Sequence, residues 1–237
     1  MTLIIIIFLI IAGIIIFGFF RGFTTFHLNK RANSRQCRIA CIGDSITYGC
    51  GVKNWPKNNY PAVLGKMLGS EYCVNNYGYS GRTVMHSGDC PYTEKTIFRK
   101  SLMFEPEIIV VKFGTNDAKV HNWKGKMVFK EEYRIFLSNY QQLQSKPEIY
   151  LCTPATAYYS DDNVEGKVFG NIIIPGQNLV EAVEAVKELG QELNIPVIDI
   201  YSYTKGHRDW FLEGLHPNVL GARMLAEKIY QGLKIQD

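Results

Sequence analysis

Near residue 45, a serine directly follows a short apolar run and stands among glycines, in the stretch CRIACIGDSITYGCG. A serine hydroxyl is a poor nucleophile at neutral pH unless a neighbouring base removes its proton. Taken alone, a serine in such a strand-to-helix turn is usually only a helix cap. Ser45 is therefore a candidate nucleophile if the rest of the chain supplies a base.

A carboxylate and a histidine stand three residues apart near the C-terminus, in the segment FLEGLHPN. Histidine is the side chain best suited to take the proton of a serine at neutral pH. Its imidazole in turn needs an acceptor on the second ring nitrogen, which fixes the tautomer and stabilises the imidazolium. His216 is the predicted base, and Glu213 is the predicted orienting carboxylate.

Acyl transfer also needs hydrogen-bond donors for the oxyanion of the tetrahedral intermediate. The segments NYGYSGRT and GTND each follow an apolar run and contain suitable donors. The predicted donors are the backbone N–H of Ser45, the N–H of Gly81 or Gly78, and the side-chain amide of Asn116. A glycine suits the second role because a backbone without a side chain can approach the substrate closely.

These groups need strands that end at one edge of a sheet. Short apolar runs predict five strands, at residues 38–42, 72–75, 107–113, 148–152 and 196–200. Apolar residues at helical spacing predict helices at residues 130–143, 178–193 and 219–233. Strands that alternate with helices predict a parallel sheet covered on both faces, an α/β fold in the form of a three-layer α/β/α sandwich. In such sheets, functional groups collect beyond the carboxyl ends of the strands.

In this order and at these separations, GDSITYG, NYGYSG, GTND and EGLHPN resemble the four sequence blocks of the SGNH (GDSL) hydrolase superfamily. The resemblance covers nearly all of the chain after the N-terminal segment. It implies a flavodoxin-like strand order 2-1-3-4-5 and hydrolysis of carboxylic esters. It also implies that Ser45 is the nucleophile, that Gly81 and Asn116 complete the oxyanion hole, and that His216 is the base.

One position departs from the pattern of this superfamily, which usually has aspartate three residues before the histidine. Glu213 occupies that position here. The additional methylene moves the carboxylate by about 1.5 Å. Either the loop adjusts to the longer side chain, or the orienting role is weakened or passes to another acid such as Asp209.

The loops near the predicted site contain aromatic and polar side chains that suit a sugar. Asp44 and Trp123 are predicted to contact the substrate. The segment GTNDAKVHNW resembles bacterial carbohydrate esterases and sialate O-acetylesterase-like members, which implies removal of O-acetyl groups from a glycan. Three alternatives stay open: a lipid esterase or lysophospholipase, a glycan O-acyltransferase, and a glycan-binding protein whose catalysis is impaired by Glu213.

The N-terminal segment MTLIIIIFLIIAGIIIFGFFRGF has no charge and no proline over residues 3–20. As a helix, this run is about 27 Å long, enough to cross the hydrocarbon core of a bilayer. We predict a transmembrane anchor or a signal segment over residues 1–22, a polar tether over residues 23–36 and the hydrolase domain over residues 37–237. Cations after the apolar run favour a cytoplasmic domain. Enzymes of this type often act outside the cell, so the side of the membrane stays open.

Charge and cysteine content narrow the range of partners. The formal net charge of +4 is modest and forms no basic stripe, so nucleic acid is not an expected partner. Cys41, Cys73 and Cys152 lie in apolar runs and are predicted to be buried, whereas Cys50 and Cys90 lie in loops and could pair in an oxidising compartment. No grouping of cysteine and histidine predicts a metal site, and no cofactor is expected. The sequence does not predict the oligomeric state.

Overall fold

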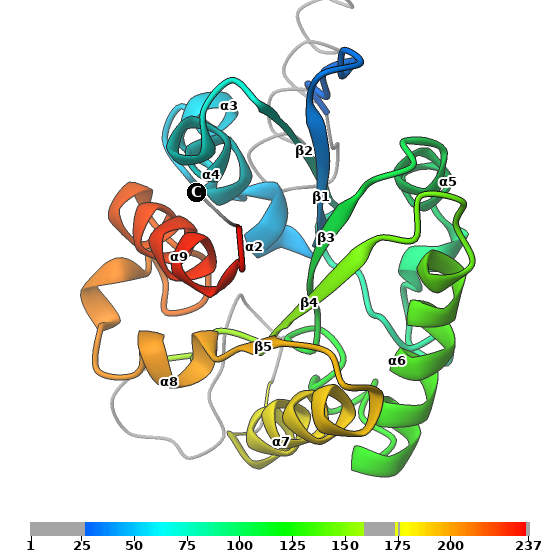
Figure 1. Cartoon of the computed structure of the whole chain (residues 1–237). Helices are drawn as coiled ribbons and strands as arrows, with labels where there is room; N and C mark the ends of the chain where they lie inside the picture. The colour runs from blue at the N-terminus through cyan, green and yellow to red at the C-terminus, as the bar shows by residue number, and fades with distance from the viewer. Residues whose placement is uncertain (1–26, 159–173, 175, 236–237) are drawn as a thin grey trace, which may run out of the picture.

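The computed structural model describes residues 27–158, 174 and 176–235. In this part of the chain, five strands form one parallel sheet with the order β2-β1-β3-β4-β5 (Figure 1). The strands are β1 (Cys37–Gly43), β2 (Tyr72–Gly78), β3 (Ile108–Lys112), β4 (Glu148–Cys152) and β5 (Val197–Ile198). The predicted parallel sheet and its strand order are confirmed.

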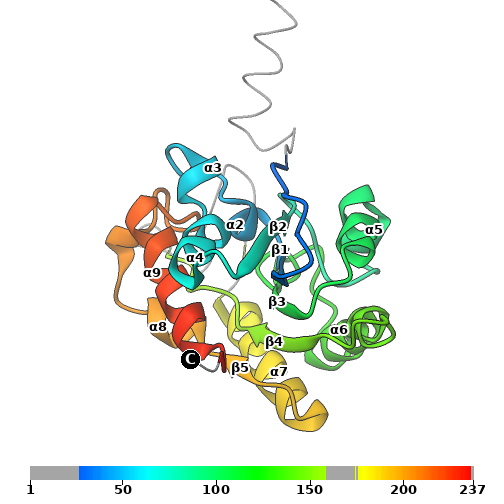
Figure 2. The same cartoon turned by 45° about the horizontal axis from the view of Figure 1, so that its top comes forward.

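Helices cover both faces of the sheet, which gives three layers (Figures 1 and 2). The described helices are α2 (Ser45–Tyr48), α3 (Trp55–Asn58), α4 (Tyr60–Leu68), α5 (Thr96–Met103), α6 (Lys126–Gln141), α7 (Gly176–Leu193), α8 (Ile200–Thr204) and α9 (Val219–Gly232), with 3-10 turns at Tyr92–Glu94 and Arg208–Trp210. Side chains of α4 and α9 pack on one face of the sheet, and those of α5, α6 and α7 pack on the other. The predicted α/β/α layering is confirmed.

The two apolar cores follow from the alternation of side chains along each strand. In β1, Ile39 and Cys41 pack in the core beneath α4 and α9, whereas Ala40 and Ile42 pack in the core beneath α5, α6 and α7. A strand that is buried on both faces has to be apolar at nearly every position. This requirement explains why the central strands are continuous apolar runs without a polar face.

The predicted and observed elements differ mainly at their ends. β5 contains only two residues because Asp199 ends the strand, and its carboxylate accepts a hydrogen bond from the Ser202 N–H at the start of α8. α6 starts at Lys126, four residues before the predicted helix. The other long helices, α7 and α9, end within one residue of their predicted positions.

The strand order creates the place where a site can form. β1 lies between β2 and β3, because the chain first adds β2 on one side of β1 and then adds β3 on the other side. Ligands of doubly wound sheets bind at this switch point, outside the carboxyl ends of the strands. The turns that follow β1, β2 and β3 carry Ser45, Gly81 and Asn116 respectively.

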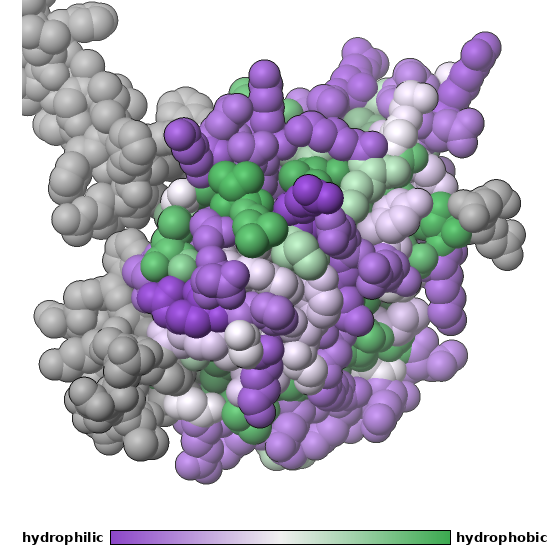
Figure 3. All heavy atoms as spheres, turned by 90° about the vertical axis from the view of Figure 1, so that its left-hand side faces the viewer, coloured by the Kyte–Doolittle hydropathy of each residue, from purple (hydrophilic) through white to green (hydrophobic). Residues whose placement is uncertain are grey.

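Over residues 27–158, 174 and 176–235, no helix combines the length and apolar character needed to span a membrane. The predicted anchor over residues 1–22 lies outside the described residues. The face formed by α4 and α9 is largely hydrophilic, with small separate hydrophobic areas (Figure 3).

All six cysteines lie in the described part of the chain, as free thiols. Cys41, Cys73 and Cys152 are buried, as predicted. Cys50 and Cys90 are each half-buried and unpaired. Burial, followed by the nearby Glu213 carboxylate, raises the pKa of the Cys50 thiol to about 11, so this thiol is protonated at neutral pH.

Candidate active site

Three predicted catalytic side chains form one chain of hydrogen bonds. The Nε2 atom of His216 lies 2.9 Å from Ser45 Oγ. On the opposite side of the imidazole, His216 Nδ1 makes a short hydrogen bond to the Oε1 atom of Glu213. Serine, histidine and carboxylate are thus connected in the order that general-base activation of a serine requires.

The turn that presents Ser45 is fixed by the residues on both sides of it. Asp44 caps α2, since its Oδ1 atom accepts a hydrogen bond of 2.9 Å from the Ile46 N–H. The end of β2 adjoins the end of β1, where the Tyr79 N–H donates to Gly43 O. Ser45 is therefore the first residue of a short helix at the carboxyl end of β1.

His216 lies on a loop that is closed against itself just before α9. The Leu212 N–H donates to the carbonyl of His216 over 2.8 Å, and Asn218 donates its N–H to Trp210 O. The Asn218 side chain then caps α9 by accepting from the Gly221 N–H. These bonds fix the backbone on both sides of His216, whose residue surface is only 8% exposed.

The same loop accommodates the longer carboxylate of Glu213. Gly214 follows it with φ +99°, and a Cβ at this position would lie 2.1 Å from the carbonyl oxygen of Tyr158. Only glycine permits this tight passage. The Tyr158 N–H donates to Gly214 O over 2.8 Å and holds the loop there. From this loop Glu213 reaches His216 Nδ1, so the longer side chain occupies the position of the orienting acid.

The surroundings of Glu213 favour the ionised form of its carboxyl group. Burial alone raises the pKa of Glu213, but the hydrogen bond and the charge of His216 outweigh it and leave the pKa of this carboxyl below its ordinary value. Glu213 also accepts a second hydrogen bond, from the backbone N–H of His216. Asp209, the alternative acid, is exposed on the preceding 3-10 turn, and its backbone carbonyl accepts from the Asn218 side chain.

The two predicted oxyanion loops meet beside the nucleophile strand. The Asn116 Nδ2 atom donates to the carbonyl of Arg82, the residue after Gly81. Gly81 adopts φ +75°, a conformation that other residues rarely take. The Gly78 N–H already donates to the side chain of Asn76 over 2.8 Å, which disfavours Gly78 as an oxyanion donor and leaves Gly81 as the predicted one.

The structure corrects the prediction that Asp44 contacts substrate. Its side chain is 1% exposed, and its Oδ1 atom lies 3.5 Å from Nζ of Lys112, which is fully buried at the end of β3. The pair lies beneath the turn that carries Ser45, so Asp44 has a structural role. Lys112 was missed in the sequence, although a single lysine within the apolar run IIVVKF is a signal, because a buried cation needs a partner.

Replacing Lys112 by methionine is expected to lower the free energy of unfolding by about 3–5 kcal/mol, because it leaves the Asp44 carboxylate buried without a counter-charge. Denaturant titration of the wild type and the variant measures this loss. The double variant Lys112→Met with Asp44→Asn removes both charges and should recover most of it. Equal losses in the single and double variants would contradict the role given to this ion pair.

Trp123 lies between two helices of the outer layer. Its Nε1 donates to Glu181 of α7 over 3.2 Å, and its ring packs 5.5 Å from that of Phe129 in α6. These contacts give the half-buried indole a packing role between α6 and α7. A contact of Trp123 with substrate stays a prediction.

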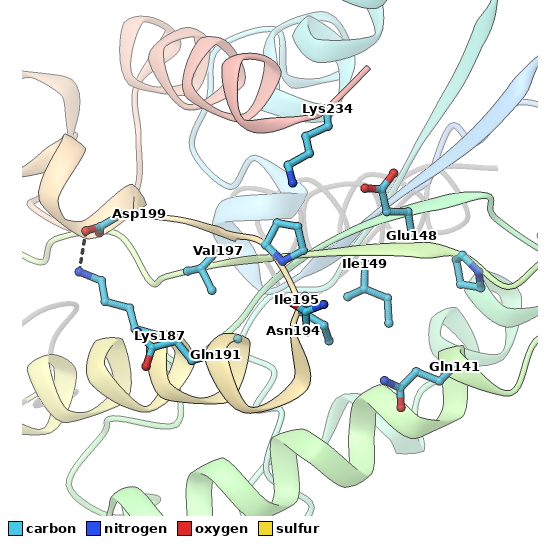
Figure 4. Close-up of a pocket in the computed structure, with 13 residues that line it drawn as sticks. Gln141, Glu148, Ile149, Lys187, Gln191, Asn194, Ile195, Val197, Asp199 and Lys234 are labelled. Atoms are coloured by element: carbon cyan, nitrogen blue, oxygen red, sulfur yellow. Dashed lines mark hydrogen bonds and ion pairs between the residues drawn. The ribbon is translucent and has the colours of Figure 1, made fainter. Parts of the chain in front are cut away.

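A groove of about 830 Å³ lies elsewhere, along the open edge of the sheet at β4 and β5 (Figure 4). Glu148, Ile149 and Val197 contribute to its lining, and Lys187 of α7 crosses to Asp199 over 2.6 Å. No member of the triad lines this groove. Its size therefore does not mark it as the catalytic site.

A serine, a histidine and a carboxylate linked by hydrogen bonds at the carboxyl ends of a parallel α/β sheet form the arrangement of a serine hydrolase. The chain belongs to the GDSL-like lipase/acylhydrolase family, whose family model matches residues 41–224. The predicted superfamily is thus confirmed.

Relatives of this chain include carbohydrate acetylesterases. The chain is 33% identical over 215 residues to an acetylxylan esterase of Xylanibacter ruminicola, with 83% of this chain and 43% of that protein aligned. The chain therefore spans less than half the length of that relative. It is also 22% identical over 199 residues to a rhamnogalacturonan acetylesterase of Bacillus subtilis, with 78% of each chain aligned.

Solved structures of low sequence identity share the fold. A carbohydrate acetylesterase from Sinorhizobium meliloti matches with a TM-score of 0.64 and 16% identity, over 83% of this chain and 97% of that one. The aryl esterase of M. smegmatis matches with a TM-score of 0.64 and 19% identity, over 83% of this chain and all of that one. At these identities, the likeness extends to the fold alone.

Proposed function

We propose that this chain is a serine esterase that removes O-acetyl groups from a carbohydrate through an acyl-enzyme intermediate. The observation that carries the proposal is the continuous hydrogen-bonded chain from Ser45 Oγ through His216 to Glu213. Two relatives, an acetylxylan esterase and a rhamnogalacturonan acetylesterase, support the acetyl group and the carbohydrate.

In the proposed reaction, Ser45 Oγ attacks the carbonyl carbon of the ester while His216 Nε2 takes the hydroxyl proton. Glu213 holds His216 with Nδ1 protonated, so that Nε2 presents its lone pair to the serine. The oxyanion receives hydrogen bonds from the amide of Asn116 and from the backbone N–H groups of Gly81 and Ser45. The sugar hydroxyl leaves with the proton from His216. In the second half of the reaction, His216 takes a proton from water, the water attacks the acetyl-serine, and Ser45 leaves with the proton from His216 as acetate is released.

Two of the alternatives predict different products from the same site. A glycan O-acyltransferase would pass the acetyl group to a sugar hydroxyl instead of water. A lipid esterase would suit an apolar surface, and Leu212, next to Glu213, has 49% of its surface exposed. The contact between Glu213 and His216 supports an active esterase over the glycan-binding protein with impaired catalysis.

Chain-length profiling of p-nitrophenyl acetate, butyrate and palmitate separates the esterase hypotheses. We expect the highest kcat/KM for the acetate, with a steep fall for longer chains. A maximum at palmitate would favour the lipid esterase. No hydrolysis of any ester would favour a binding protein.

Replacing Asn116 by alanine is expected to lower kcat by about 10² to 10³ with little change in KM, because its amide acts mainly on the oxyanion of the transition state. Steady-state kinetics with p-nitrophenyl acetate measures both constants. A variant that is impaired only in KM would show that Asn116 binds the ground state instead.

The proposal includes a membrane anchor over residues 1–22. The uncharged run over residues 3–20 is long enough that it should keep the full-length protein in the membrane fraction during extraction with high salt. Cell fractionation followed by N-terminal sequencing tests this expectation. Full-length protein released only by detergent supports the anchor, whereas protein in the medium with a trimmed N-terminus identifies a signal peptide. Protease access in intact cells determines the side.

A further inference from the structure

We propose that Asn122 is a positioning residue for the oxyanion hole, which fixes the loop of Asn116 against the loop of Gly81. The two loops are the β2 loop, residues 79–91, and the β3 loop, residues 113–125. This inference rests on the proposed function, since it concerns the same reaction. Asn122 itself does not belong to the triad or to the predicted oxyanion donors.

Both the nitrogen and the oxygen of the Asn122 side-chain amide form hydrogen bonds within the protein. Its Nδ2 atom donates to the backbone carbonyl of Asn116 over 2.9 Å and to Oδ1 of Asp89 over 2.9 Å. Its Oδ1 atom accepts the backbone N–H of Asp89 over 2.8 Å. The residue is only 1% exposed, so water does not readily replace these bonds.

The contact with Asp89 extends through the β2 loop toward Gly81. Thr83 donates its N–H to Cys90 O, and its own carbonyl accepts from the Tyr92 N–H, so the loop is closed on itself between these residues. Asp89 is thereby tied to Thr83, two residues after Gly81. Because Asn116 Nδ2 also donates to Arg82 O, the two loops are joined at both ends of this closed segment.

The carboxylate of Asp89 is suited to accept from Asn122. Burial raises the pKa of Asp89, but hydrogen bonds from Asn122 and His121 outweigh burial and leave it below its ordinary value. An ionised acceptor makes a stronger hydrogen bond than a neutral one. Oxyanion donors act only when they are held in advance at the place where charge develops. Loss of the Asn122 bonds would release the Asn116 carbonyl from Asp89 and loosen this part of the β3 loop, while the Met85 N–H still donates to Asp117 Oδ1 and His121 still contacts Asp89.

The test compares Asn122→Ala with Asn116→Ala, the double variant and a matched control, using p-nitrophenyl acetate. A displacement of about 1 Å in a catalytic group costs about 10² in rate, so Asn122→Ala should lower kcat by about that factor and leave KM nearly unchanged. If Asn122 acts through the oxyanion hole, the double variant should be no slower than Asn116→Ala alone. Asn139→Ala, on the exposed surface of α6, should retain the wild-type kcat.

A second pair of variants keeps the test valid if Asn122→Ala folds poorly. Asp89→Asn preserves an acceptor oxygen opposite Asn122 and should keep most of kcat, whereas Asp89→Ala removes one of the three bonds of Asn122 and should lower kcat, by less than Asn122→Ala does. Hydrogen exchange at the Asp89 amide measures the bond between Asp89 N–H and Asn122 Oδ1 without an activity assay. The exchange should accelerate in Asn122→Ala but not in Asn139→Ala.

The outcomes distinguish the positioning role of Asn122 from the proposed esterase function. Wild-type kcat in Asn122→Ala, or a loss that multiplies with that of Asn116→Ala, overturns the positioning role. If the wild type itself hydrolyses no ester, the proposed function fails. The exchange data then test only whether Asn122 holds the two loops together, and unchanged exchange at the Asp89 amide overturns that statement.

Discussion

Replacement of Ser45 by alanine is expected to lower kcat for ester hydrolysis by at least about a thousandfold while the protein remains folded. The reason is the position of Oγ, 2.9 Å from His216 Nε2, where the imidazole can take its proton. Alanine leaves no atom to form the acyl-enzyme. Stopped-flow or steady-state assays with p-nitrophenyl acetate measure the loss, and circular dichroism checks the fold.

A serine-directed phosphonate gives an independent readout of the same residue. It should add one label per chain, which peptide mapping locates to Ser45. His216→Ala should be about as slow as Ser45→Ala, and the double variant no slower, because the triad acts as one unit. Substantial hydrolysis by Ser45→Ala, or a label on another residue, would exclude the proposed mechanism.

Replacement of Glu213 by glutamine is expected to reduce kcat by about 10⁴, the loss found when the acid of a serine triad becomes an amide. Glutamine can donate a hydrogen bond to His216 Nδ1, which places the proton on Nε2, the nitrogen that faces Ser45. The base is then unable to accept the serine proton. The same steady-state assay measures this change, with KM expected to stay nearly constant.

Two matched variants distinguish the orientation of His216 by Glu213 from a loss that any substitution in this loop would cause. Glu213→Asp keeps the charge but withdraws it by about 1.5 Å, so its rate should fall between those of the wild type and the glutamine variant. Asp209→Asn should have the wild-type rate, because Asp209 is exposed on the neighbouring turn. A nearly silent Glu213→Gln together with a severe Asp209→Asn would reverse the assignment of the acid.

The sheet could be predicted because its physical requirements appear directly in the sequence. A central parallel strand is buried on both faces, so β1 and β3 must be apolar runs, and the polar turn residues mark where each run ends. The end of β5 was not predictable by hydrophobicity, since Val197, Ile198 and Ile200 are all apolar. The Asp199 cap, a hydrogen bond visible only in the fold, ends that strand.

The catalytic residues were predictable because their chemistry requires particular side chains in a particular order. Ser45, His216 and Glu213 are brought together as expected, although 171 positions separate the serine from the histidine. Supporting residues were harder to identify. Asp44 precedes the nucleophile directly, which suggested a contact with substrate. In the structure, the Asp44 carboxylate instead points into the core, toward the buried Lys112. The bonds of Asn122 depend on two loops meeting in space.

Acetate release from an acetylated xylan oligosaccharide, measured for the wild type and for Ser45→Ala, tests the central proposal most directly. We predict that the wild type releases acetate and leaves an unsubstituted oligosaccharide, and that Ser45→Ala releases at least about a thousandfold less. Equal release by both proteins would contradict Ser45 as the nucleophile. A wild type that hydrolyses p-nitrophenyl palmitate but releases no acetate from any acetylated glycan would contradict the carbohydrate esterase.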